Sequence, residues 1–156
     1  MIIIGIDPSL NGTGYGVLKK EGSRLIFLTS GVIDCKNIAT TEGKLFKTHS
    51  VLSDVIKEFK PVKVGMEKTF VNKNPQTSLL LGMARGGIML TIASNNISIT
   101  EFAPNFIKKA ITGNGKAEKE QLGFMVKKLI SGIPAEKSFK TLDETDALSV
   151  AVVCSL

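Results

Sequence analysis

The first 18 residues place the strongest constraint on how this chain can fold. Residues 2–6 are isoleucines around one glycine, a pattern typical of a strand that is buried on both faces, and this run ends at Asp7. Residues 8–14 favour turns and residues 15–18 resume an extended pattern, so the segment is predicted to form a β-hairpin. The Asp7 carboxylate then lies at the rim of a sheet. An Asx turn made by Asp7 itself explains this stretch equally well.

Composition and charge narrow the class of protein. The 156 residues are 43% hydrophobic and 22% charged, which predicts one globular domain spanning residues 1–156. A formal net charge of +6 and a pI near 9.4 favour a polyanionic partner such as nucleic acid. Cys35 and Cys154 lack the spacing of a zinc site, which indicates reduced thiols and a cytoplasmic location. No apolar run approaches the ~18 residues of a membrane span, so we expect no membrane partner.

Hydrophobic periodicity predicts an α/β fold. Apolar runs and alternation predict strands at residues 2–6, 15–18, 24–32, 62–66 and 96–102. Helical spacing predicts helices at residues 41–59, 78–94, 104–112, 114–131 and 141–153. Three consecutive strands followed by helix–strand units predict a mixed five-stranded sheet, with three antiparallel strands and then two parallel ones, flanked by helices.

Two of the predicted helices bear on packing. His49, the single histidine, lies on or beside the apolar face of helix 41–59, so we expect a hydrogen-bonded core or boundary residue rather than a catalytic group. Helix 78–94 is apolar nearly all round and must therefore bury two faces. A subunit interface and burial within its own domain explain this helix equally well.

Acidic residues recur where the predicted strands end. Glu67 directly follows strand 62–66, just as Asp7 follows strand 2–6. Because the crossover between these strands makes them parallel, Asp7 and Glu67 are expected at the same edge of the sheet. A solvated residue at a strand end is the alternative explanation of Glu67.

Further acidic residues open the last predicted helix. Asp143 and Asp146 are three residues apart, so their carboxylates share one side of that helix. A capping box between Thr141 and Glu144, together with the helix dipole, explains Glu144 well and Asp143 adequately. It explains Asp146 poorly, because one more acid there adds only repulsion unless a cation is nearby.

Asp7, Glu67, Asp143 and Asp146 together predict a carboxylate-only pocket on a basic protein. Oxygen ligands without sulfur or imidazole suit Mg²⁺ or Mn²⁺, which bind phosphate oxygens jointly with the protein. Two such ions would support in-line attack of water on a phosphodiester. The pattern therefore predicts metal-dependent phosphodiester hydrolysis.

Basic and aromatic residues near the acids predict contacts with DNA. Lys108, Lys116 and Lys119 belong to a lysine-rich segment, and Lys108 and Lys119 lie near predicted helix starts, where the helix dipole disfavours a cation. Contact with phosphate would justify this placement. Phe70, three residues after Glu67, lies on a polar loop from which it could wedge between bases or pack back onto the domain.

Several motifs resemble the RuvC family of Holliday-junction resolving endonucleases, within the ribonuclease H-like superfamily. The matching segments are GIDPSLNGTGYGV at 5–17, MEKTFVNKN at 66–74, LGMARG at 81–86, GNGKAEKEQ at 113–121 and DETDALSVA at 143–151. The resemblance implies that Asp7, Glu67, Asp143 and Asp146 bind two Mg²⁺ ions, with Mn²⁺ as substitute. It implies that Lys108 and Lys119 are basic residues of the active site, Lys119 being catalytic, and that Phe70 probes the junction. It also implies a homodimer that nicks opposing strands of a four-way DNA junction in recombination and repair.

Some features depart from this family or fit other classes. Ser9 stands where the family usually has glycine, and the sequence stops at Leu156, where bacterial members run on into a basic tail. Partnership with a branch-migration motor is therefore left open, and a compact phage-type member is suggested. A nuclease of the ribosomal-RNA maturation type, a catalytically inactive junction-binding protein and a kinase or actin-like ATPase are the alternatives. The last needs two such domains, which this length does not supply.

Overall fold

A six-stranded mixed sheet forms the centre of the molecule in the computed structural model, which describes residues 1–69, 73–139 and 142–156. The strands are β1 (Ile2–Asp7), β2 (Gly12–Glu21), β3 (Arg24–Asp34), β4 (Lys63–Glu67), β5 (Ser98–Phe102) and β6 (Ile130–Ser131), in the order β5-β4-β1-β2-β3-β6. β1, β2 and β3 are antiparallel neighbours, whereas β4 is parallel to β1, β5 to β4 and β6 to β3. The predicted mixed sheet is confirmed, with the two-residue β6 added at one edge.

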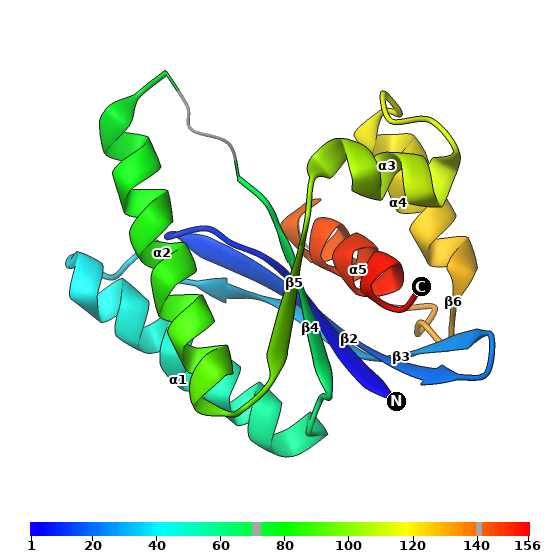
Figure 1. Ribbon diagram of the computed structural model, residues 1–156, viewed down its shortest axis with the longest axis horizontal. Helices are drawn as coiled ribbons and strands as arrows, with labels where there is room; N and C mark the ends of the chain where they lie inside the picture. Colours follow the sequence, from blue (N-terminus) through cyan, green and yellow to red (C-terminus); the bar gives the residue numbers. More distant parts are fainter. Residues whose placement is uncertain (70–72, 140–141) are drawn as a thin grey trace.

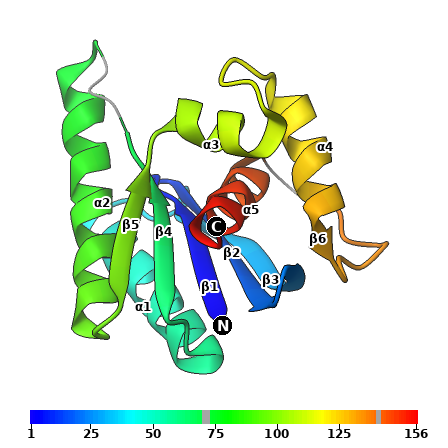
Figure 2. The same cartoon turned by 45° about the vertical axis from the view of Figure 1, so that its right-hand side comes forward.

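Helices cover both faces of this sheet (Figures 1 and 2). They are α1 (Thr41–Phe59), α2 (Pro75–Ser94), α3 (Pro104–Thr112), α4 (Lys119–Leu129) and α5 (Leu142–Cys154). α1 and α2 lie together against one face, and α5 lies against the other, with α3 and α4 above it. Two buried hydrophobic clusters, one on each face, hold these layers together.

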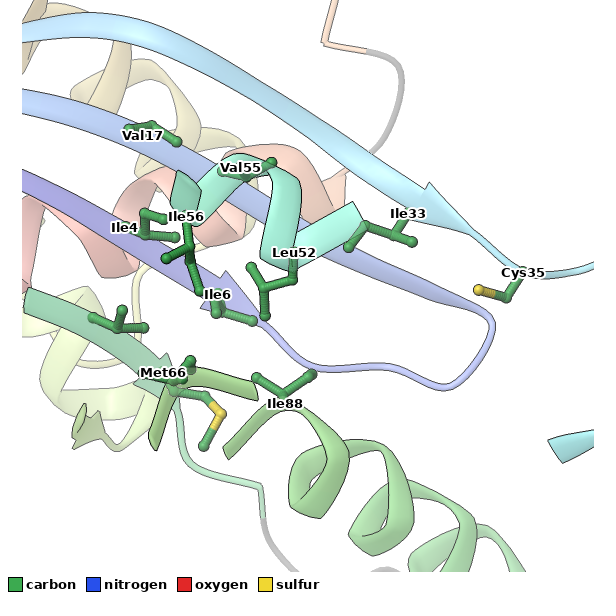
Figure 3. Packing of buried hydrophobic residues seen from close by; sticks show 12 residues of the cluster. Ile4, Ile6, Val17, Ile33, Cys35, Leu52, Val55, Ile56, Met66 and Ile88 are labelled. Carbon is green, nitrogen blue, oxygen red and sulfur yellow. The ribbon is translucent and has the colours of Figure 1, made fainter. Parts of the chain in front are cut away.

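The cluster beneath α1 and α2 explains the apolar pattern of the first strand. Ile4 and Ile6 of β1 are fully buried and pack with Leu52 of α1 and Ile88 of α2 (Figure 3). Ile3 faces the opposite side and is also fully buried. Because β1 is covered on both faces, its residues form an unbroken apolar run rather than an alternating one.

α5 crosses the other face unusually close to the strands, because glycines line its path. A Cβ placed on Gly5 would lie 2.1 Å from the backbone oxygen of Ala147, and one on Gly14 would lie 2.2 Å from the backbone oxygen of Asp143. Gly16 and Gly65 are similarly close to Leu148 and Cys154. The absence of these side chains lets the helix backbone rest directly on β1, β2 and β4.

Helix boundaries differ from the predictions most in α2 and α4. α2 begins at Pro75 rather than residue 78, because Asn74 caps the helix by accepting hydrogen bonds from the backbone N–H groups of Gln76 and Thr77. The helix predicted over 114–131 is shorter: α4 begins at Lys119, and its last two predicted residues form β6. Leu129, the last residue of α4, is 44% exposed.

Two further expectations need correction. His49 is exposed rather than part of the core, although its Nδ1 lies 2.9 Å from Oγ1 of Thr91 in α2, which gives it the expected hydrogen bond. The expectation that no segment has the length and composition of a membrane span is also wrong. By these two criteria alone α2 qualifies, and within this fold its residues Ala84, Ile88 and Ile92 are buried.

Candidate active site

Asp7 and Glu67 lie side by side at the end of two parallel strands. Ile6 of β1 is in register with Met66 of β4, so the next residue of each strand carries its carboxylate to the same edge. Both side chains are half-buried. The prediction that the two strands are parallel and end together is confirmed by this register.

α5 brings two more carboxylates to this edge. Gly14 is the cross-strand partner of Asp7, and the backbone of Asp143 rests on Gly14. Asp143 and Asp146, three residues apart in α5, are both half-buried and close enough to Asp7 to influence its ionisation. The glycine in β2 therefore lets the helix start beside the strand end, which brings Asp143 and Asp146 to the edge that carries Asp7 and Glu67.

The electrostatics of this cluster centre on Asp7. Burial, followed by the charges of Glu67, Asp146 and Asp143, raises the pKa of Asp7 to about 8, against the opposing charge of Lys119. Burial and the charge of Asp146 also raise the pKa of Glu67, against the influence of Lys119 and Lys108. Carboxylates with raised pKa values are stabilised in their ionised form by any cation that enters.

Lysines lie on one side of the acidic cluster. Lys119, the first residue of α4, places its Nζ 3.2 Å from Oδ2 of Asp146, and the charge of Asp146 together with this hydrogen bond raises the pKa of Lys119. Lys108 of α3 is close enough to act on Glu67. Lys116 is exposed on the loop between α3 and α4. Phe70 lies outside the described residues.

Two hollows open beside the first turns of α5. One, of about 150 Å³, is lined partly by Glu67, Lys108, Lys119 and Asp146. The other, of about 390 Å³, is lined partly by Asp143. Glu67 and Asp146 therefore border one hollow, and Asp143 borders the other.

The chemistry of the donors fits a hard divalent cation. All four acids offer carboxylate oxygens, and Mg²⁺ and Mn²⁺ prefer such ligands while keeping some of their waters. Within the described parts of the chain, however, no three His, Cys, Asp or Glu side chains are grouped closely enough to hold one metal ion. The carboxylates would have to close around an ion, which is the expected response of a repulsive acidic cluster to a cation.

Two residues of this region escaped prediction. Glu144 is 2% exposed, accepts a hydrogen bond from Oγ of Ser30 at 2.7 Å and pairs with Nζ of Lys137 at 2.5 Å. The capping partner assigned to it, Thr141, lies outside the described residues. Arg85 of α2 donates from Nη1 to the backbone oxygen of Glu67 at 2.6 Å. A lone arginine in an otherwise uncharged helix was the available signal for Arg85.

Curated relatives match the whole chain. The family profile described as "Crossover junction endodeoxyribonuclease RuvC" matches residues 3–154. Proteins of this name from Rickettsia bellii and Rickettsia conorii are each 44% identical over 154 residues, covering 99% of this chain and 96% of the relative. These relatives are bacterial, and the suggestion of a phage-type member has no support from them.

Solved structures share the fold. RuvC of T. thermophilus, solved in complex with a Holliday junction substrate, superposes with a TM-score of 0.86 at 24% identity, covering 97% of this chain and 91% of that one. The Fowlpox virus resolvase, solved with substrate Holliday junction DNA, gives a TM-score of 0.61 at 14% identity, covering 97% and 96%. Given the profile match over residues 3–154 and curated relatives that are 44% identical along nearly their whole length, this chain belongs to the RuvC family of crossover junction endodeoxyribonucleases.

Proposed function

We propose that this protein is a structure-selective endonuclease that resolves four-way DNA junctions by metal-dependent phosphodiester hydrolysis. Family membership supports the reaction. The single observation that carries it to this chain is the meeting of Asp7, Glu67, Asp143 and Asp146 at one edge of the sheet, on a protein of net charge +6. In this proposal residues 1–156 form one nuclease domain of the cytoplasm.

The four carboxylates would hold the metal. When bound, two Mg²⁺ ions, or Mn²⁺ in their place, activate the attacking water and stabilise the leaving oxygen. The chain's own contribution is to present oxygen ligands from β1, β4 and α5 at one edge of the sheet, beside two hollows. Burial of Asp7 keeps that carboxylate poorly solvated, so it gains from a cation more than an exposed acid would.

Lysines and an aromatic residue would position the DNA. Lys119 lies next to Asp146, where its ammonium group can both hold that carboxylate and meet a phosphate of the bound strand. Lys108 and Lys116 would extend the contact along the backbone on the α3 and α4 side. We retain Phe70 as the side chain that enters the junction, since it follows Glu67 by three residues.

A homodimer would use the outer face of α2. The large side chains Leu79, Met83 and Leu90 are 61%, 41% and 69% exposed, and they lie at helical spacing on one side of the helix. Gly82 and Gly86 lie between them, and no atom lies within 4 Å of where a Cβ on either would be. An exposed apolar face with small residues in it favours close packing against a second copy. This supports the subunit interface over burial within the domain.

Cleavage assays separate this proposal from its alternatives. Wild-type protein is incubated with four-way, three-way and linear DNA and with structured RNA, in Mg²⁺ or in chelator. We expect paired nicks in the four-way junction that require Mg²⁺. Preferred cleavage of RNA would indicate a nuclease of the ribosomal-RNA maturation type, and binding without cleavage would indicate an inactive junction-binding protein.

Substitutions then assign the reaction to the site. Asp7→Asn and Asp146→Asn should abolish Mg²⁺-dependent nicking while junction binding persists, because the changes remove metal ligands and leave the basic surface. Asp54→Asn is the matched control, since Asp54 is an exposed acid on α1. Residual cleavage by both site variants at the wild-type rate would refute the assignment.

A further inference from the structure

Arg85 connects helix α2 to the strand that carries Glu67. Its side chain is 16% exposed, and Nη1 donates hydrogen bonds to the backbone oxygen of Glu67 at 2.6 Å and to Oγ1 of Thr69 at 3.1 Å. Nη2 pairs with the carboxylate of Glu101 in β5. One guanidinium therefore binds the last residue of β4, the segment that follows it and the neighbouring strand.

The contact between Arg85 and Glu67 lies at the end of β4, where its pairing with the neighbouring strands stops. Glu67 is in register with Phe102 of β5, and the N–H of Lys68 donates to the backbone oxygen of Phe102 at 2.8 Å. On the other side β1 ends at Asp7, and the register between β1 and β4 ends at Ile6 and Met66. Arg85 of α2 thus holds the backbone oxygen of Glu67 at the residue where β4 ends.

The inward packing of α2 uses other residues than this arginine. Arg85 is the one charged residue of α2, whose buried residues Ala84, Ile88, Thr91 and Ile92 pack inward. Moving a cation into a half-buried position carries a desolvation cost that an apolar side chain avoids. Unlike an apolar side chain, the planar guanidinium group can bind two acceptors at fixed angles. Here these acceptors are a backbone oxygen and a carboxylate.

We propose that Arg85 is a positioning residue for the metal site: it holds the end of β4 so that the Glu67 carboxylate faces Asp7. This inference rests on the proposed function. Residues that hydrogen-bond to metal ligands and orient them typically lower metal affinity by about 10- to 100-fold when they are removed. The effect of Arg85 is therefore expected in metal binding more than in global stability.

The test measures metal binding without DNA. The midpoint of thermal unfolding is followed as Mn²⁺ is added to wild-type protein, Arg85→Met, Arg85→Lys and Lys63→Met, because a ligand of the folded state raises that midpoint. Lys63→Met is the matched control. Lys63 is a cation in β4, the strand that carries Glu67, but it lies at the other end of that strand. Its Nζ donates to the backbone oxygen of Cys154 at 3.4 Å. The Mg²⁺ dependence of junction cleavage is measured on the same proteins.

We expect Arg85→Met to need about tenfold more Mn²⁺ for half of the wild-type rise, with cleavage recovering at high Mg²⁺. Arg85→Lys keeps the positive charge but loses the guanidinium group, so the Mn²⁺ concentration that it needs should lie between those of wild type and Arg85→Met. Lys63→Met should match wild type. A wild-type metal response in Arg85→Met, or in Arg85→Lys if the methionine variant does not fold, would overturn the inference. Absence of any Mn²⁺ effect on the wild-type protein would instead refute the proposed metal site itself.

Discussion

The carboxylate of Glu144 and the ammonium group of Lys137 form an ion pair of 2.5 Å, in which Glu144 is 2% exposed and the Lys137 side chain 27% exposed. The pair joins the first turns of α5 to the segment that precedes it, and Lys137 also donates to the backbone oxygen of Ser30 at 3.2 Å. Because Glu144 follows Asp143 directly, this contact anchors the end of α5 that carries the acids.

Breaking this pair should destabilise the protein. Lys137→Met removes the ammonium partner of the buried Glu144 carboxylate, so we expect the free energy of unfolding to fall by about 2–4 kcal/mol in urea. Lys127→Met is the control, because Lys127 is an exposed cation 5.0 Å from the same Phe139 ring that Lys137 approaches. That variant should lose less than about 1 kcal/mol. Equal losses in the two variants would show that the ion pair between Glu144 and Lys137 does not stabilise the protein more than an exposed lysine does.

Stability of the metal-free protein should depend on the ionisation of Asp7. Its pKa is about 8 in the folded protein against 3.8 for an unperturbed aspartate, so the folded state binds the proton more tightly. The resulting stabilisation is complete below about pH 4 and is lost as the pH rises to about 8. In chelator, wild-type protein should therefore lose at least about 1 kcal/mol more than Asp7→Asn between pH 5 and pH 8.

Urea unfolding at several pH values measures this difference. Asp54→Asn serves as the control and should follow the wild-type curve, because Asp54 is exposed on α1. Parallel curves for wild type and Asp7→Asn would contradict the raised pKa.

Gly14 should tolerate no side chain. The Cβ of Gly14→Ala would lie 2.2 Å from the backbone oxygen of Asp143, so α5 must move away from β2. We expect a loss of about 2 kcal/mol or more in the free energy of unfolding, together with loss of cleavage. Gly12→Ala, in the same strand, places its Cβ 3.4 Å from Val32 and should change stability by less than about 0.5 kcal/mol. Similar behaviour of the two variants would contradict the close approach.

The proposed dimer face can be tested by charge. Met83→Glu combined with Leu90→Glu places two carboxylates on the exposed side of α2, and burying them between two copies is costly. Light scattering should then report the mass of a monomer. A cooperative thermal unfolding transition should show that this monomer is still folded. Phe124→Glu changes an equally exposed apolar residue on α4 and should leave the dimer intact. A dimer that survives the double substitution would place the interface elsewhere.

The sequence allowed most of the fold to be predicted because its signals are local. The apolar run before Asp7 and the turn residues after it define the first hairpin, and the helical spacing of apolar residues predicts α1 at the residues it occupies, Thr41–Phe59. The acidic positions were predictable for the same reason, since each lies at the end of a recognisable element.

Long-range contacts were not predictable in this way. Gly14 looks like a turn residue in the sequence, yet its role is to admit Asp143 from a helix about 130 positions later in the chain. Glu144 looks like a capping acid, and only the fold brings it to Ser30. Arg85 reaches Glu67 across the gap between a helix and a strand, a relation that periodicity does not encode.

Acids from β1, β4 and α5 are proposed to bind divalent ions jointly, and crystals soaked in Mn²⁺ would show whether they do. Anomalous scattering locates manganese independently of any assumption about the ligands. We expect manganese between Asp7 and the carboxylates of Glu67, Asp143 and Asp146, and no such peak in crystals of Asp7→Asn. Manganese bound only elsewhere, or bound identically in Asp7→Asn, would contradict this proposal.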